Sequence, residues 1–239
     1  MFLREIAIHA DERIVDRFPG GFVKRFHRET CGVTEVFNSL LKKKLIGPNS
    51  PKICMTFSDL INEAPSSLTP LRILWPFDFS RYVVADDRTK AELVASALLS
   101  VLMWIGGKVN WPLEVIQDTW DQAKLQSFRY CGTWGKSWTS PTKHWKASVE
   151  IQMDVSGVDL AIVVTTRAKR EVVRRFQIDK LLCYDGCLMN YISLGEWVSD
   201  SEFRLESSAF PPKEWRVAID QRCGGKGGRN RKSASCLPG

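Results

Sequence analysis

The segment from Leu93 to Ile105 constrains the fold of this chain more than any other. It holds 13 residues, all apolar except Ser96 and Ser100. A bilayer crossing needs about 20 apolar residues, so the segment is too short to span a membrane. A helix that is apolar on nearly all sides must be covered by other elements. We therefore expect a buried helix over residues 88–105, capped at its start by Asp86 and Asp87.

Short strands and further helices are expected around this central helix. Alternation and β-branched content predict strands over residues 2–9, 53–57, 71–75 and 81–85. Capping residues, apolar spacing and a proline at position 112 predict helices over 34–45 and 113–128.

The second half of the chain changes to a two-residue period. Residues 149–155 alternate, residues 159–166 are rich in Val and Ile, and a hairpin is predicted over 191–206. Residues 171–178 favour a third strand, with a helix over 167–177 as the alternative. The predicted fold class is α+β, in which N-terminal strands and two or three helices surround the buried helix and a C-terminal antiparallel meander follows.

Domain organisation and charge are linked through the last 20 residues. We expect one globular domain over residues 1–219, open to subdivision near 129–146, and a flexible, basic, Gly-rich tail over 220–239. The tail carries five Lys and Arg against one Asp, so it supplies more than half of the net charge of +7. The body is only mildly basic, and its overall charge does not by itself indicate a polyanionic partner.

Cysteine usage and the N-terminus predict a location. The chain has seven cysteines at irregular spacing, and its first ten residues lack the apolar run of a signal peptide. We expect free thiols and a cytoplasmic protein. Cys183 and Cys187 form the one closely spaced pair, which we interpret as buried or half-buried thiols rather than zinc ligands, and whether they ever pair stays open.

Several catalytic chemistries lack their motifs. Gly135 begins a Gly-Lys-Ser sequence, but the first glycine of a phosphate-binding loop would have to stand where Tyr130 is. The sequence contains no Asp-x-Lys or Glu-x-Lys of the kind found in metal-dependent nucleases. Cys131 and His144 could meet, but nothing around them forms a nucleophile motif. We assign no catalytic residue, no metal and no cofactor, and an enzyme with a dispersed site remains a third hypothesis.

Residues 129–146 are predicted to form a long loop rich in aromatic and basic side chains. Aromatic rings supply contact area and lysines supply long-range attraction, which is typical of a binding surface. The alternative is that the tryptophans fold back onto the core. The candidate partner-binding residues are Tyr130, Trp134, Lys136, Trp138, Lys143, His144 and Trp145.

A second basic cluster follows at Arg167, Lys169, Arg170 and Arg174. On a helix Arg167, Arg170 and Arg174 would share a face. On a strand Arg174 and Arg175 would point to opposite faces, so the cluster could not form a single patch. The alternatives are a solvated hairpin end or contact with a phosphate or an acidic protein.

The run Phe79-Ser-Arg-Tyr-Val-Val-Ala-Asp-Asp-Arg-Thr-Lys-Ala-Glu-Leu, then an apolar helix, a Trp-containing loop and a hairpin, resembles the small α+β immunity proteins of bacterial toxin systems. The resemblance is one of layout, over residues 70–180. It implies tight one-to-one binding that blocks a toxin domain, here a neutral or acidic one because the body is mildly basic.

Two function classes follow. The first is a non-enzymatic protein-binding module with a neutral or acidic protein partner. The alternative is a nucleic-acid-binding protein that stacks bases on the aromatics of 129–146 and binds phosphates with the arginines of 167–175. No membrane association is expected, and the oligomeric state is left open.

Overall fold

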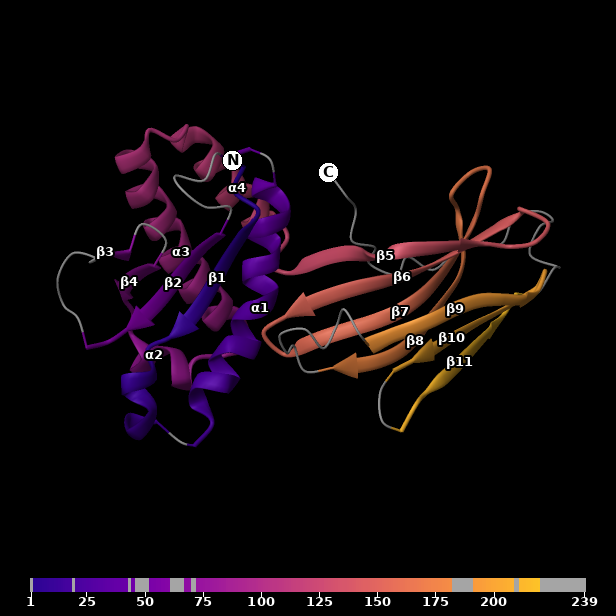
Figure 1. Ribbon diagram of the computed structural model, residues 1–239, viewed down its shortest axis with the longest axis horizontal. Coiled ribbons are helices and arrows are strands. Elements are labelled where there is room, and N and C mark those ends of the chain that lie inside the picture. Colours follow the sequence, from indigo (N-terminus) through magenta and orange to yellow (C-terminus); the bar gives the residue numbers. More distant parts are fainter. Residues whose placement is uncertain are drawn as a thin grey trace. The chain divides into compact units, whose positions relative to one another are not determined.

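The computed structural model describes residues 2–18, 20–42, 44–45, 52–60, 67–69, 72–181, 191–208 and 211–219 (Figure 1). The chain divides into two compact units. Unit 1 contains Met1–Tyr130 and Met153–Val158, and unit 2 contains Cys131–Gln152, Asp159–Leu181 and the described residues from 191 to 219. Mixed α and β elements with a C-terminal antiparallel part confirm the predicted fold class.

Unit 1 is a four-stranded sheet with helices. Its elements are β1 (Glu5–Ala10), the 3-10 helix η1 (Glu12–Arg17), α1 (Phe22–Leu41), β2 (Lys52–Ser58), β3 (Ser67–Thr69), β4 (Arg72–Pro76), α2 (Phe79–Val84), α3 (Asp87–Val109) and α4 (Leu113–Leu125). The sheet order is β1-β2-β4-β3. Strands β1, β2 and β4 are parallel, and β3 is antiparallel to β4.

An aromatic cluster forms much of the unit 1 core. Phe26 of α1 has its ring centroid 5.0 Å from that of Tyr82 and 5.1 Å from that of Phe79, both edge-on. Phe57 and Phe77 stack at 4.9 Å. Edge-to-face and offset pairs of this kind stabilise a core beyond the apolar area they bury. The cluster joins the carboxyl ends of β2 and β4 to α1 and α2.

Helix α3 is the predicted buried helix. The Asp86 side chain accepts a hydrogen bond of 2.7 Å from the backbone N–H of Thr89, and Asn110 ends the helix in a left-handed conformation. One side of α3 is buried in the unit 1 core, and its buried residues are Ala91, Val94, Ala95, Leu98, Val101, Leu102, Ile105 and Gly106. By length and composition alone α3 is the one described helix that could cross a membrane.

Two N-terminal predictions are wrong. The helix expected over 34–45 begins at Phe22, and Thr34 lies inside it, donating its hydroxyl to the Thr30 carbonyl instead of capping. The strand expected over 81–85 is helix α2, because the Asp78 side chain accepts from the backbone N–H of Arg81 and starts a helical turn there.

Helix α1 contains a glycine that no other residue could replace without a shift of the backbone. A Cβ atom on Gly32 would lie 2.8 Å from the backbone carbonyl carbon and oxygen of Met153. Real Cβ contacts are essentially never this short, so the helix approaches this backbone more closely than any side chain would allow. Close packing here offsets the roughly 1 kcal/mol that glycine costs inside a helix.

Unit 2 consists of two sheets. The first has the order β5-β6-β7-β8, formed by β5 (Tyr130–Thr139), β6 (Trp145–Asp154), β7 (Gly157–Thr166) and β8 (Val172–Leu181). The second is antiparallel with the order β11-β10-β9, formed by β9 (Ile192–Ser199), β10 (Glu202–Ser207) and β11 (Glu214–Ala218).

Tryptophan packing joins the two sheets of unit 2. The Trp138 ring of β5 lies 5.3 Å from that of Phe203 on β10, and the Trp197 ring of β9 lies 5.5 Å from Phe203. The indole N–H of Trp197 donates to the Trp138 carbonyl at 3.0 Å. A Cβ on Gly195 would lie 2.5 Å from the Trp138 ring, so only glycine leaves room for it.

The expected loop over 129–146 is not a loop. Residues 130–139 are strand β5, and β6 begins at Trp145. Glycine and serine lower the strand propensity of this segment, but the ladder offered by β6 outweighs it. Residues 172–181 form a strand, as preferred over the helix alternative, and β11 lies in a segment for which no element was predicted.

The cysteines differ from expectation at one position. Cys54 and Cys131 are not disulfide-bonded, but Cys31 is, so the prediction that every cysteine is a thiol is wrong. The partner of Cys31 lies outside the described residues, as do Cys183, Cys187 and the 220–239 tail.

Candidate functional site

Three turns of unit 2 meet at one end of its sheets, here called the hairpin end. They are the β5–β6 turn at residues 140–144, the β7–β8 turn at 167–170 and the β9–β10 turn at 199–201 (Figure 1). The backbone N–H of Arg167 donates to the His144 carbonyl at 2.9 Å, and the backbone N–H of Thr142 donates to Asp200 Oδ1 at 3.0 Å. Hydrogen bonds therefore hold all three turns together.

The two basic turns are closed in the same way. In the first, Ser140 donates its backbone N–H to the Trp145 carbonyl at 3.0 Å, and Ser140 Oγ accepts the Trp145 N–H at 3.1 Å. In the second, Thr166 donates to the Glu171 carbonyl at 2.9 Å, and Thr166 Oγ1 accepts the Glu171 N–H at 3.2 Å. A hydroxyl residue thus fixes each turn at its base.

Five exposed side chains on these turns carry or can carry positive charge. They are Lys143, His144, Arg167, Lys169 and Arg170. Within the described part of the chain none of these side chains has a hydrogen-bond or ion-pair partner. These side chains are therefore exposed to solvent and free to contact an anionic group.

The excess of basic residues in the body is concentrated in the four-stranded sheet of unit 2. Residues 131–181 contain nine Lys and Arg against five Asp and Glu. Since the body as a whole is only mildly basic, the rest of it has no positive excess of its own. The local charge of the four-stranded sheet is therefore higher than the overall composition suggests.

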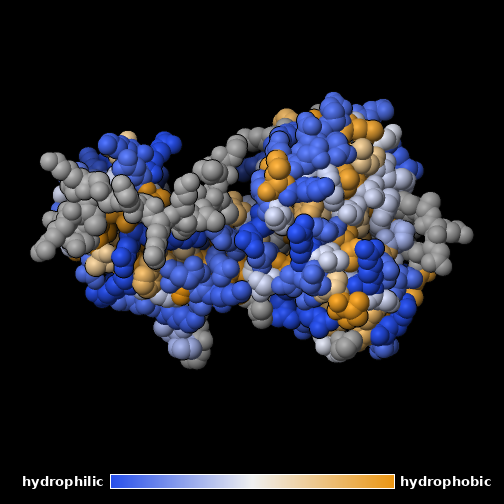
Figure 2. All heavy atoms as spheres, turned by 180° about the vertical axis from the view of Figure 1, so that it is seen from behind, coloured by the Kyte–Doolittle hydropathy of each residue, from blue (hydrophilic) through white to orange (hydrophobic). Residues whose placement is uncertain are grey.

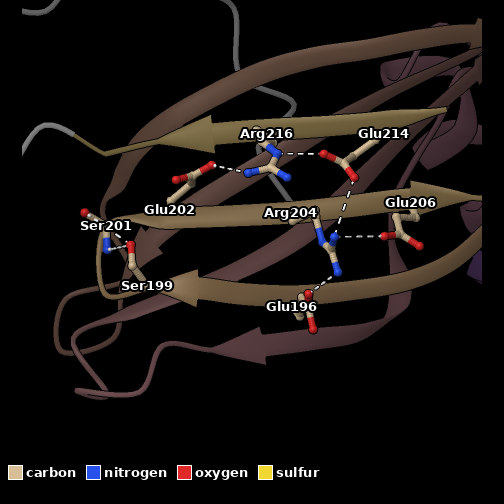
Figure 3. A network of polar contacts seen from close by, with 8 residues as sticks. All are labelled: Glu196, Ser199, Ser201, Glu202, Arg204, Glu206, Glu214 and Arg216. Atoms are coloured by element: carbon tan, nitrogen blue, oxygen red, sulfur yellow. Dashed lines mark hydrogen bonds and ion pairs between the residues drawn. The ribbon is translucent and has the colours of Figure 1, made fainter.

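The three-stranded sheet has the opposite arrangement (Figure 3). Arg204 on β10 pairs with Glu196 on β9, with Glu206 at 3.4 Å and with Glu214 on β11 at 3.6 Å. Arg216 in turn pairs with Glu214 at 2.6 Å and with Glu202 at 3.3 Å. Hydrogen bonding to Arg216 lowers the pKa of Glu214. Four glutamates against two arginines leave this face acidic and internally paired.

The contact between β8 and the second sheet also uses ion pairs. Lys213 Nζ lies 2.6 Å from Asp179 Oδ2, and the Tyr191 hydroxyl donates to the same carboxylate. Burial raises the pKa of Asp179, but the hydrogen bonds from Lys213 and Tyr191 outweigh burial, so the pKa is lowered. This carboxylate is held in its charged form.

The aromatic candidates do not gather at the hairpin end. Trp138 packs inward on Phe203, and Tyr130 lies against the unit 1 core. Trp145 begins β6 beside the turn and is half-buried, and the Trp134 side chain is outside the described residues. The described residues therefore do not assemble a platform of exposed rings for stacking bases.

The remaining basic candidates lie on the strands. Lys136 is exposed on β5, and Arg174 is exposed on β8. The structure thus brings the candidates of the two turns together and leaves these two outside the hairpin end.

Sequence reasoning did not include Asp200, Thr142, Ser140 and Thr166 in the site. Their signal was weak, because Ser, Thr and Asp in turns are common. Both turns share a Ser or Thr that hydrogen-bonds the residue five positions later, with basic residues between, and this spacing could have identified them.

Unit 1 offers one half-buried polar cluster. The Tyr82 hydroxyl donates to Glu29 at 2.8 Å, and Lys90 Nζ lies 3.2 Å from the same carboxylate. Burial and then the Glu29 charge raise the pKa of Tyr82 well above its usual range. Glu29 of α1 therefore pairs with both Tyr82 of α2 and Lys90 of α3, and the cluster links the three helices. Across the described ranges, no group of three or more His, Cys, Asp or Glu could hold a metal ion.

Solvent-facing residues of unit 2 are mostly hydrophilic in the view of Figure 2, where apolar residues are visible chiefly over unit 1.

No protein-family model, curated protein or solved structure matches this chain, so its function is argued from the hairpin end itself.

Proposed function

We propose that this chain is a non-enzymatic binding module that recognises an acidic protein surface through the hairpin end. The observation that carries the proposal is the set of five unpaired basic side chains on two turns that are hydrogen-bonded to each other, with the Asp200 turn bonded to the first of them. A surface whose turns are already fixed loses little conformational entropy on binding. Charge complementarity then supplies a fast association rate and partner selection.

The charge of the second sheet favours a compact acidic partner. Glu196, Glu202, Glu206 and Glu214 lie in the same unit as the hairpin end. A long polyanion that extended past the turns would meet these carboxylates, whereas a discrete acidic patch would not. The proposal includes the immunity role, in which the acidic patch belongs to a toxin domain that the hairpin end covers.

Nucleic acid is the second candidate, and the concentration of basic residues in 131–181 is the observation that favours it. Binding would depend on phosphate contacts, because Trp138 packs inward and the described aromatics form no stacking surface. Affinity would then fall steeply with salt, by a factor that grows with each phosphate neutralised.

The test uses the full chain as bait in lysate of the cells that produce it, with and without nuclease. The variant Lys169→Glu/Arg170→Glu reverses two charges at the hairpin end, and Lys24→Glu/Lys124→Glu is the matched control on exposed helix positions of unit 1. We expect one stoichiometric acidic protein that survives nuclease, is retained by the control and is lost with the hairpin variant. Retention by the hairpin variant contradicts the proposal, and loss on nuclease treatment selects nucleic acid.

A cytoplasmic location is part of the proposal, and the Cys31 disulfide is the observation that weighs against it. Disulfides persist in oxidising compartments and are rare in the cytosol. Electrophoresis of protein alkylated in intact cells decides the matter. A reduced Cys31 supports the cytoplasm, and an oxidised Cys31 supports an oxidising compartment.

A further inference from the structure

Two basic residues of the hairpin end have a backbone conformation that favours glycine. Lys143 has φ 62° and Arg170 has φ 57°, both in the left-handed region. The Lys143 N–H donates to the Ser140 carbonyl at 2.9 Å, and the Arg170 N–H donates to the Thr166 carbonyl at 2.9 Å. Turn geometry therefore imposes this conformation on both residues.

The other described non-glycine residues with positive φ have a different setting. Asn110, Ser127 and Phe128 follow the ends of α3 and α4. A left-handed residue commonly ends a helix, so these three need no further explanation. Lys143 and Arg170 remain, one in each of two neighbouring turns.

Glycine is the least strained residue at a left-handed turn position, and Asn or Asp come next. A long basic side chain adds strain there, and within the described residues it makes no side-chain hydrogen bond or ion pair that would offset the strain. Backbone strain retained on a surface turn is a reason to look for function at that residue. The same feature occurs twice, on turns joined by the hydrogen bond from Arg167 to His144.

We propose that Lys143 and Arg170 are the residues of the hairpin end that determine partner choice, each contacting carboxylates of an acidic protein segment. This inference rests on the proposed function and deepens it. Lys143 presents a compact ammonium and Arg170 a planar guanidinium that can bind a carboxylate through two N–H groups. The partner therefore carries at least two carboxylates, one within reach of each turn.

The test measures binding of the full chain to a fluorescent decaglutamate peptide at low salt by anisotropy, with a 20-nucleotide oligothymidylate as the second probe. The variant Lys143→Gly/Arg170→Gly removes both side chains and relieves the strain. We expect its affinity for decaglutamate to fall at least fivefold while its melting temperature stays equal or rises by a few degrees.

Two control variants separate charge from position. Lys24→Gln/Lys124→Gln removes the same net charge from exposed helix positions, and we expect less than a twofold loss. Ser127→Gly relieves a left-handed residue outside the hairpin end, and we expect a melting temperature that is equal or higher and unchanged affinity.

Three results overturn the inference. Equal losses for the two double variants show a general charge effect, which leaves the proposed function standing. A melting temperature several degrees lower for the glycine variant shows that the two side chains stabilise the fold. A wild-type chain that binds oligothymidylate but not decaglutamate, or neither probe, overturns the proposed function together with the inference.

Discussion

The charged side chains of the three-stranded sheet are paired, whereas, among the described residues, those at the hairpin end of the four-stranded sheet are not. On the three-stranded sheet, Arg204 and Arg216 are each surrounded by carboxylates of neighbouring strands. At the hairpin end of the four-stranded sheet, Arg167 and Arg170 have no such partner among the described residues. Both surfaces contact the same solvent and belong to the same unit.

This difference separates charges that serve the fold from charges that are available to a partner. Cross-strand pairs of opposite charge stabilise a sheet modestly and fix its register. Unpaired cations on turns make no stabilising ion pair, so their removal should not lower stability and should change chiefly what the molecule binds. The following variants test this separation.

The largest effect is expected where the two sheets meet. Trp138→Ala removes the ring that packs on Phe203 and keeps the backbone carbonyl that accepts the Trp197 indole N–H. We expect a loss of about 3 kcal/mol in the free energy of unfolding, as for other large aromatic truncations. Urea unfolding monitored by circular dichroism measures it, and Val172→Ala, at an exposed position of β8, is the control. A loss below about 1 kcal/mol would mean that Trp138 is a surface residue.

A matched arginine pair tests the comparison directly. Arg204→Met leaves Glu196, Glu206 and Glu214 facing one another without their shared cation, and we expect a loss of about 1–2 kcal/mol. Arg170→Met removes an unpaired cation, and we expect a change within about 0.5 kcal/mol. Equal losses for both variants, measured by urea unfolding at neutral pH, would remove the distinction between the two sheets.

Acid should weaken the ion pair between Asp179 and Lys213. The pKa of Asp179 is lowered in the folded state, so its stabilising contribution is complete above the ordinary carboxyl pKa and is lost as pH falls through the folded value. We expect Lys213→Met, which removes the ion pair, to show a smaller loss of stability from pH 5 to pH 2.5 than wild type. Arg170→Met should follow the wild-type pH profile, and identical profiles for all three proteins would contradict the assignment.

The smallest effect is expected at Asp200. Asp200→Ala removes the carboxylate that accepts the Thr142 N–H, and we expect a loss of about 0.5–1 kcal/mol. The more sensitive measurement is hydrogen exchange at the Thr142 amide, which should accelerate while exchange at Phe203 in the core does not. Unchanged exchange at Thr142 would show that the three turns are not held together through this bond.

Local patterns predicted the elements whose residues determine their own structure. Helix α3 follows from its apolar content and the Asp86 cap, and β6 and β7 follow from alternation and the turn between them. The start of α1 could not be predicted, because Gly32 lies inside the helix and glycine lowers helix propensity. Glycine is required there by the close backbone of Met153, which is far away in the sequence.

The same limit applies to β5 and to the site. Strand β5 has low intrinsic propensity and depends on its neighbour β6. The basic residues of both turns were visible in the sequence, and their separation along the chain is large. Their proximity depends on the bonds from Arg167 to His144 and from Thr142 to Asp200, which no local pattern contains.

The contact between Gly195 and Trp138 has a consequence for recognising relatives of this chain. A glycine that makes room for an indole ring can change only if the tryptophan becomes smaller at the same time. Sequences that share this fold should therefore vary at these two positions together, while the basic positions of the turns should follow the partner of each protein. A sequence search that gives positions 195 and 138 more weight than the charged turns would find related proteins even where their binding partners differ.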